Sequence, residues 1–139
     1  ISDIGAASWN LAQTVFSRLA EGGEEIEEYL RERLVRIFGP AHVEPGQRII
    51  GSSTQEWEVS ALLKVGNART VFQAVSDHPI SVYRTSTAFH DLAATPNPPG
   101  LVAVVKDRQS LGSKLSLLSQ VGRVIQSDQP DEAYQRATG

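Results

Sequence analysis

The sequence predicts an α/β domain in which a mixed β-sheet of about four strands is flanked by helices. Three observations support this prediction: helical and strand-like patterns alternate along the chain, a tight hairpin turn lies near its middle, and a short apolar strand follows a helix. The expected order of elements is α-α-β-β-β-α-β-α. A helix between the third and fourth strands allows those strands to run parallel, so helices are expected on both faces of the sheet.

Two helices are predicted at the start of the chain. The first covers residues 6–19, where apolar side chains recur at helical spacing until a Gly-Gly pair ends the pattern. The second covers residues 24–38, and its apolar stripe is expected to face the core. Its glutamates precede most of its arginines, an order that suits the helix dipole, and Glu27 and Arg31 are spaced for an ion pair.

Three strands are predicted next. The first, over 42–50, is interrupted at Pro45-Gly46, which indicates an edge strand or a bulge. The second, over 55–65, is the clearest strand because apolar and polar residues alternate along it. A Gly-Asn pair then forms a hairpin turn, and the third strand returns over 70–76.

The second half of the chain adds a helix, a strand and another helix. The first of these helices is predicted over 79–93 with Asp77 as its N-cap. After a proline-rich loop, the apolar run at 101–105 is typical of a strand buried on both faces. The last helix is expected over 110–126, and residues 127–139 are expected to form a frayed polar tail.

The composition is that of an ordinary globular protein. Of its 139 residues, 40% are hydrophobic and 21% are charged. We expect one domain over 1–126, made of a core at 24–126 and an added helix at 6–19, followed by the tail. Because the chain begins at Ile1 rather than at methionine, we also expect it to be a fragment.

Several classes of protein are excluded by what the composition lacks. The sequence has no cysteine, which excludes a disulfide scaffold, a zinc–thiolate site and cysteine catalysis, and which suits a reducing compartment such as the cytoplasm. Its apolar runs are too short to cross a bilayer, so no membrane partner is expected. Glycine-rich phosphate loops are missing, which argues against NAD and nucleotide cofactors. The net charge of −3 argues against a dedicated nucleic-acid binder, because such domains are usually basic.

The hairpin places two oxygen-bearing side chains on one face. Once the turn is fixed, Ser60 lies opposite Gln73, and Glu58 becomes a diagonal neighbour of Gln73. Trp57 and Phe72 are expected on the opposite, core-facing side. Because Mg²⁺ binds carboxylate and amide oxygens, the pair is a candidate metal site, and Mg²⁺ is the only cofactor suggested. The simpler alternative is an exposed glutamate and a half-buried amide bonded to a neighbouring side chain.

The order of elements and this pair of residues resemble the restriction-endonuclease-like superfamily, also called PD-(D/E)XK. The resemblance covers residues 24–126. Its members carry an acidic residue on the second core strand, matched here by Glu58, and a (D/E)-x-K tripeptide on the third, matched here by Gln73-Ala74-Val75. The resemblance implies a metal-dependent nuclease in which Glu58 and Gln73 are both metal ligands and catalytic residues.

The matched motif departs from the family pattern. Val75 replaces the lysine that would position and activate the attacking water, and such a loss typically costs orders of magnitude in rate. Two residues are candidate substitutes: Lys106, just past the fourth strand, as a displaced catalytic base, and Arg84, on the following helix, as a phosphate contact. Arg84 has a simpler alternative as a solvated helix residue.

The sequence is compatible with three functions. The first is a catalytically inactive nuclease-like domain that associates with nucleic acid or binds a protein partner, which is how the resemblance implies that such decayed domains persist. The second is an active Mg²⁺-dependent nuclease that uses a displaced lysine or arginine. The third is a small non-enzymatic adaptor or immunity-type interaction protein, or a homodimer subunit, whose acidic helix at 24–36 faces a basic partner.

Overall fold

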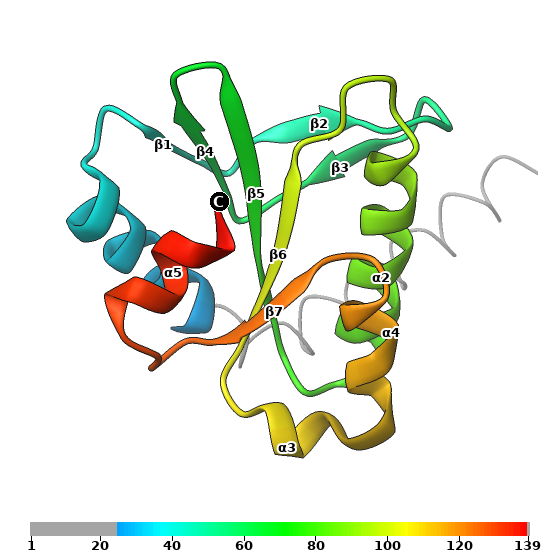
Figure 1. Ribbon diagram of the computed structural model, residues 1–139. Helices are drawn as coiled ribbons and strands as arrows, with labels where there is room; N and C mark the ends of the chain where they lie inside the picture. Colours follow the sequence, from blue (N-terminus) through cyan, green and yellow to red (C-terminus); the bar gives the residue numbers. More distant parts are fainter. Residues whose placement is uncertain (1–24, 139) are drawn as a thin grey trace, which may run out of the picture.

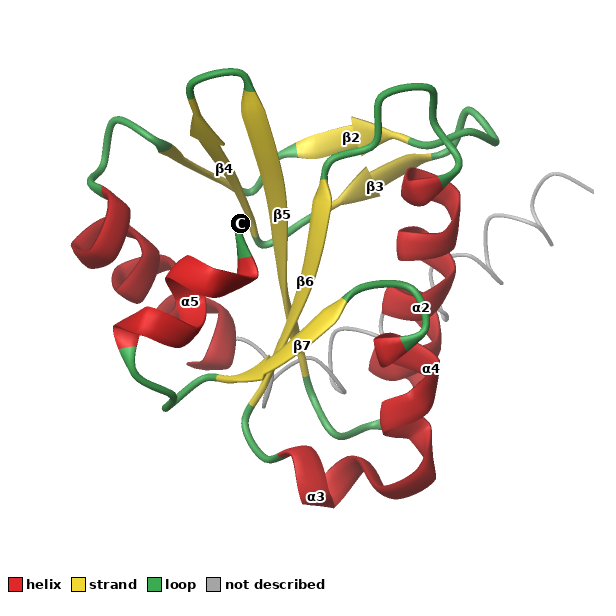
Figure 2. Cartoon of the chain, viewed as in Figure 1, coloured by secondary structure: helices red, strands yellow, loops and turns green. Residues whose placement is uncertain are grey.

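A computed structural model describes residues 25–138, which form a mixed β-sheet covered on both faces by helices (Figures 1 and 2). The sheet has five strands in the order β1-β4-β5-β6-β7, and a separate two-stranded ribbon pairs β2 with β3. The strands are β1 (Val43–Pro45), β2 (Arg48–Ile50), β3 (Glu56–Glu58), β4 (Ala61–Val65), β5 (Ala68–Val75), β6 (Gly100–Val105) and β7 (Arg123–Gln126). The helix predicted over 6–19 lies outside the described residues.

Helices lie before β1 and after β5, β6 and β7. The first described helix covers residues 25–38. The others are α2 (Pro79–Ala93), α3 (Arg108–Leu111), the 3-10 turn η1 (Gly112–Lys114), α4 (Leu115–Ser119) and α5 (Asp131–Ala137). None of the helices in the described part of the chain is long and apolar enough to cross a membrane.

The sheet is antiparallel on one side and parallel on the other. β4 pairs antiparallel with both β1 and β5, whereas β6 pairs parallel with both β5 and β7. The chain passes from β5 to its parallel neighbour β6 through α2, as a parallel pair requires. The predicted α/β class, the mixed sheet and the helices on both faces are therefore confirmed, with one strand and one ribbon more than expected.

Each face of the sheet has its own apolar core. The helix at 25–38 and α5 cover one face, and α2 and α4 cover the other (Figure 1). Strand β6 serves both cores, because Val102 and Val104 point to the first face while Leu101, Ala103 and Val105 point to the second. The prediction of a strand buried on both faces is thus confirmed.

The predicted strand over 55–65 is wrong in one respect, because the chain breaks between β3 and β4. Trp57 and Val59 pack into the core under α2, whereas Ala61 and Leu63 pack into the core on the other face. Phe72 also packs on that other face, so it does not share a side with Trp57 as expected. The break lets β3 leave the main sheet and pair with β2.

The C-terminal part of the prediction is also wrong. The helix expected over 110–126 divides at Gly112, whose φ of +57° suits glycine, and its last residues form β7. The tail expected to fray contains α5, in which Tyr134 is fully buried. The N-cap of α2 is His78 rather than Asp77, and its side chain makes no capping bond.

A buried arginine joins the first and last described helices. The Arg33 guanidinium donates to the carbonyls of Ser127 (3.0 Å) and Gln129 (2.8 Å) and to the Asp131 carboxylate (2.5 Å). It also lies 4.5 Å from the ring centre of Tyr134, whose hydroxyl donates to the same Ser127 carbonyl. These contacts fix α5 against the helix at 25–38.

Candidate functional site

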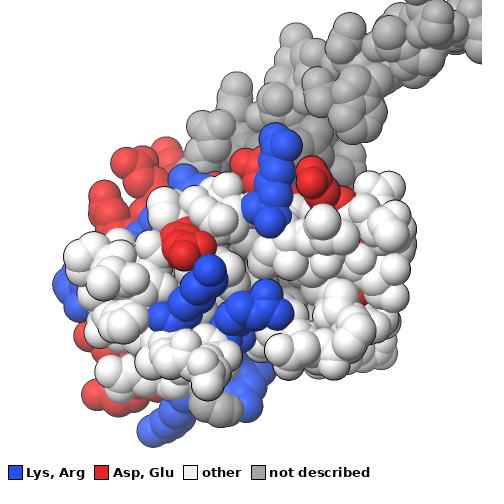
Figure 3. Space-filling model, turned by 90° about the horizontal axis from the view of Figure 1, so that it is seen from above, with Lys and Arg blue, Asp and Glu red and all other residues white. Residues whose placement is uncertain are grey.

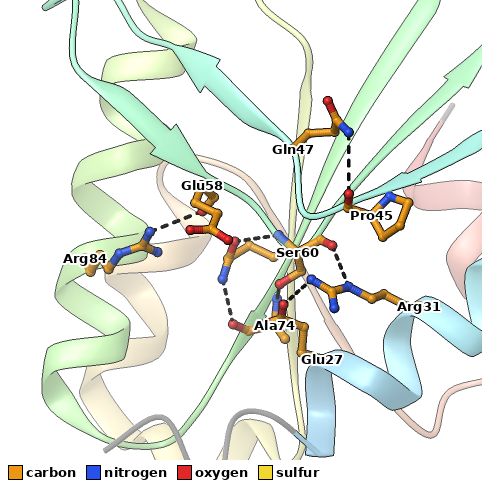
Figure 4. Close-up of polar contacts among 9 residues, drawn as sticks. Glu27, Arg31, Pro45, Gln47, Glu58, Ser60, Ala74 and Arg84 are labelled. Carbon is orange, nitrogen blue, oxygen red and sulfur yellow. Dashed lines mark hydrogen bonds and ion pairs between the residues drawn. The ribbon is translucent and has the colours of Figure 1, made fainter. Parts of the chain in front are cut away.

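The break between β3 and β4 is the centre of a polar cluster that draws on five parts of the fold (Figure 4). We call it the strand-break cluster. It consists of Glu27 and Arg31 from the helix at 25–38, Glu58 from β3, Ser60 from the break, Gln73 from β5 and Arg84 from α2.

At the start of β4, the side chains of Ser60 and Gln73 form hydrogen bonds with the backbone. The Gln73 Oε1 atom accepts a hydrogen bond from the Ser60 backbone N–H (3.1 Å), and the Gln73 Nε2 atom donates to the Ala74 carbonyl (3.1 Å). The Ser60 hydroxyl in turn accepts from the Ala74 backbone N–H (3.0 Å). Both ends of the Gln73 amide are therefore used by the backbone.

Arg31 closes the cluster from the first helix. Its Nε atom donates to the Ser60 carbonyl at 2.9 Å, and its guanidinium forms an ion pair with Glu27. The sequence predicts this ion pair from the i,i+4 spacing, and the structure confirms it. The contact of Arg31 with the strand break, in contrast, depends on how the helix at 25–38 packs on the sheet.

Arg84 meets the same cluster from α2, on the other side of the break (Figure 4). Its guanidinium donates to the Glu58 carbonyl at 3.2 Å. Burial lowers the pKa of Arg84, while the nearby carboxylates of Glu58 and Glu27 act in the opposite direction. The charges of both glutamates thus reach the same guanidinium.

The cluster is electrically balanced, which bears on its ability to hold a metal ion. It contains two carboxylates, Glu27 and Glu58, and two guanidiniums, Arg31 and Arg84. Within residues 25–138, no three histidine, aspartate or glutamate side chains gather so that they could hold a metal ion. A divalent cation placed between Glu58 and Gln73 would meet one carboxylate and one engaged amide, with the positive charges of Arg31 and Arg84 in the same cluster.

The predicted site residues are only partly brought together. The hairpin register is confirmed, with Ala61 opposite Phe72. Glu58 is not in the main sheet as a diagonal neighbour of Gln73, as expected, because it lies on β3 across from Arg48. Val75 itself is 1% exposed and belongs to the core under α2.

Lys106 lies away from the cluster. It follows Val105, which pairs with Val75, so it lies three residues beyond Ala103, the neighbour of Gln73. That separation is about 10 Å along a strand. Its side chain is exposed and, in the described part of the chain, forms no hydrogen bond or ion pair with the cluster.

Sequence reasoning missed a second polar centre at Asp91 on α2. Its carboxylate accepts bonds from the Ser53 backbone (2.8 Å), the Ser53 hydroxyl (2.6 Å) and Trp57 Nε1 (2.8 Å). The bonds from Ser53 and then Trp57 hold the pKa of Asp91 below its usual value. A Cβ atom at Gly51 would lie 2.1 Å from this carboxylate, so glycine allows the close approach. Asp91 therefore fastens the β2–β3 ribbon to α2.

Comparisons with models of known protein families, with curated proteins and with solved structures find no match.

Proposed function

We propose that this chain is a nuclease-like binding module that associates with nucleic acid and does not cleave it. The observation that carries the proposal is the bonding of Gln73. In a working site of this type the corresponding side chain would offer a free oxygen to a metal ion, but here both ends of its amide are bonded to the Ser60 and Ala74 backbone.

The arrangement of the sheet supports the nuclease-like part of the proposal. A helix is followed by three strands that pair antiparallel in the order β1-β4-β5, and α2 then leads to the parallel strand β6. This is the α-β-β-β-α-β order on which the resemblance to the restriction-endonuclease-like superfamily rests. The β2–β3 ribbon is an insertion between β1 and β4 in this description.

The charges and the packing of the cluster support the absence of cleavage. Hydrolysis of a phosphodiester by this family needs carboxylates around a cation and a positioned base. The charges of the two glutamates in the cluster are balanced by those of Arg31 and Arg84, and Val75 is packed in the core at the position of the expected lysine. The same groups are well suited to hold the strand break in place.

The test is a cleavage and binding assay on the full chain. A fluorescein-labelled 20-base-pair duplex is incubated with the protein and Mg²⁺ or Mn²⁺, and anisotropy and product gels are followed together. We expect binding that weakens as salt rises and no product above background.

Metal-dependent cleavage that is lost in Glu58→Ala but kept in Glu28→Ala, an exposed glutamate outside the cluster, would favour the active nuclease. No binding of duplex or single strand, together with a dimer or hetero-complex on sizing, would favour the adaptor instead. Either result overturns the proposal.

A further inference from the structure

The turn end of the main sheet carries positive charge, in contrast to the balanced cluster at the other end of β4. Lys64, near the end of β4, lies directly across from Arg69, near the start of β5. Side chains in such a position have Cβ atoms about 5 Å apart, and like charges placed there destabilise a sheet. Such a pair lowers the stability of the fold unless a negatively charged group lies between or beside the two cations.

The fold compensates this pair only in part. The Lys64 ammonium lies 3.3 Å from the Glu44 carboxylate, but both side chains are about half exposed, and such pairs contribute little. The Arg69 guanidinium donates to the Asn97 carbonyl (3.0 Å), which carries no net charge. A positive charge therefore remains at this end of the hairpin.

The neighbouring segments add to this charge rather than cancel it. The segments that enter or leave the main sheet at this end cover residues 41–44, 64–69, 94–100 and 120–123. They contain Lys64, Arg69 and Arg123 against one acidic residue, Glu44, whereas the whole chain has a net charge of −3. Viewed from above, blue side chains cross the middle of the surface, and much of the red lies toward its edge (Figure 3). We call Lys64 and Arg69, which face each other across the hairpin, the basic sheet end.

The acidic residues collect elsewhere on the molecule. The helix at 25–38 holds four glutamates against three arginines, and residues 127–132 hold three acidic residues and no basic one. This separation of charge would orient an approaching polyanion toward the basic sheet end. An overall negative charge is thus compatible with local binding of phosphate.

Lys64 and Arg69 are the part of this surface that can hold a phosphate. Arg123 lies farther away, because it pairs with Val102, the neighbour of Phe72. It is two strands and three residues from Arg69, about 14 Å away, and its guanidinium donates to the Arg136 carbonyl. Lys64 and Arg69 are close enough for oxygens of one phosphate to accept from both. The segments named above contain no Phe, Tyr or Trp that could stack on a base, so the main contacts would be with the backbone.

We infer that the basic sheet end binds the phosphate backbone of nucleic acid without reading its sequence, an inference that rests on the proposed function. The strand-break cluster, where a nuclease-like domain would hold its substrate, is then not the main contact. The two surfaces lie at opposite ends of β4, four residues apart between Ser60 and Lys64.

The experiment compares two double charge reversals in the full chain. Binding of the labelled 20-base-pair duplex and of its single strand is measured by anisotropy between 50 and 200 mM salt. The test variant is Lys64→Glu/Arg69→Glu, and the matched control is Arg36→Glu/Arg108→Glu, which changes the net charge equally at two exposed positions. A Lys64→Gln/Arg69→Gln variant repeats the test without new negative charge, and circular dichroism checks that each variant is folded.

We expect the test variant to weaken duplex binding at least about 10-fold and the control less than about 3-fold. The slope of log K against log salt should become shallower by about 2 in the test variant, because two phosphate contacts are lost. Scrambling the duplex sequence should change affinity by less than about 2-fold.

Equal weakening in both variants would overturn the inference, because it would show only an effect of net charge. Undiminished binding by folded test variants would overturn it while leaving the proposed function in place. Displacement of the duplex by poly-glutamate as effectively as by unlabelled duplex would assign the surface to an acidic protein instead. Metal-dependent cleavage would refute the proposed function alone.

Discussion

The two ends of the β4–β5 hairpin differ in how their polar groups are bonded and how their charges are balanced. At the strand break, Ser60 and Gln73 are bonded to the backbone, and each guanidinium is close to a glutamate. At the turn, Lys64 and Arg69 face each other, Glu44 forms an ion pair with Lys64, and the Arg69 guanidinium donates to the Asn97 carbonyl. The charges at the first end are balanced within the cluster, whereas the two cations at the second end have one carboxylate between them.

This difference indicates which end serves the structure and which end serves binding. Polar groups that are fully bonded inside a protein are costly to remove, whereas exposed charges usually can be changed with little loss of stability. Substitutions at the strand break should therefore lower stability and spare binding. Substitutions at the turn should do the reverse.

The largest expected effect on stability is that of Ser60→Ala. The side chain is 2% exposed, and its loss leaves the buried Ala74 N–H without a partner. We expect the free energy of unfolding to fall by about 1–3 kcal/mol in urea titrations. Ser113→Ala, at an exposed position outside the cluster, is the control and should stay within about 0.5 kcal/mol. A comparable small change for Ser60→Ala would remove the distinction between the two ends.

A second substitution tests whether the strand break can be converted into a metal site. Gln73→Glu offers a carboxylate but loses the donor to the Ala74 carbonyl, so we expect about 1–2 kcal/mol of destabilisation at pH 7. Protonation of the new side chain restores a donor, so the loss should shrink below about pH 4. Stabilisation of this variant by millimolar Mg²⁺, measured as a rise in melting temperature, would contradict our description of the cluster.

At the turn end, Arg69→Glu is expected to stabilise the fold. It replaces a like-charge pair across the hairpin by an opposite pair with Lys64, a change of up to about 1 kcal/mol. The melting temperature should rise by about 1–4 °C at low salt, and the gain should fade as salt is added. Binding of the duplex should weaken in the same variant. A lower melting temperature would show that Arg69 supports the fold through Asn97.

The smallest effect is expected from the Asp91 contact that joins the ribbon to α2, away from both ends of the hairpin. Because its pKa is lowered in the folded state, its carboxylate stabilises the protein above the usual aspartate pKa near 4, and this contribution is lost as the pH falls through the lower folded value. The melting temperatures of the natural chain and Asp91→Asn should differ at pH 6 and converge toward pH 2. A constant difference across this range would rule out the linkage.

Local sequence patterns were enough to predict a large part of the fold. Helix α2 has the predicted bounds because Pro79 starts it and its apolar spacing is regular, and the hairpin register follows from one turn. The break at Ser60 could not be predicted, because the alternation of apolar residues continues through it while the core on each face changes. Strand β7 was missed because Val121 and Ile125 also fit a helical stripe.

The candidate site was predictable to a similar degree. The hairpin pattern identified Glu58 and Gln73, but not the bonds that occupy Gln73, because these depend on the break. Arg31 was recognised as a partner of Glu27 within one helix, and its bond to Ser60 depends on packing between distant segments. The charge on the turn was visible in the sequence, but its meaning depended on the pairing of Lys64 with Arg69.

The buried Arg33 has a consequence for the order in which the protein matures during synthesis. The helix that carries it is made early, but its partners Ser127, Gln129 and Asp131 leave the ribosome about a hundred residues later. Until then, α5 has not been made and cannot cover the apolar stripe of that helix. This sheet face therefore completes its core only after residue 131 has been made, a late step expected from contacts so distant in sequence.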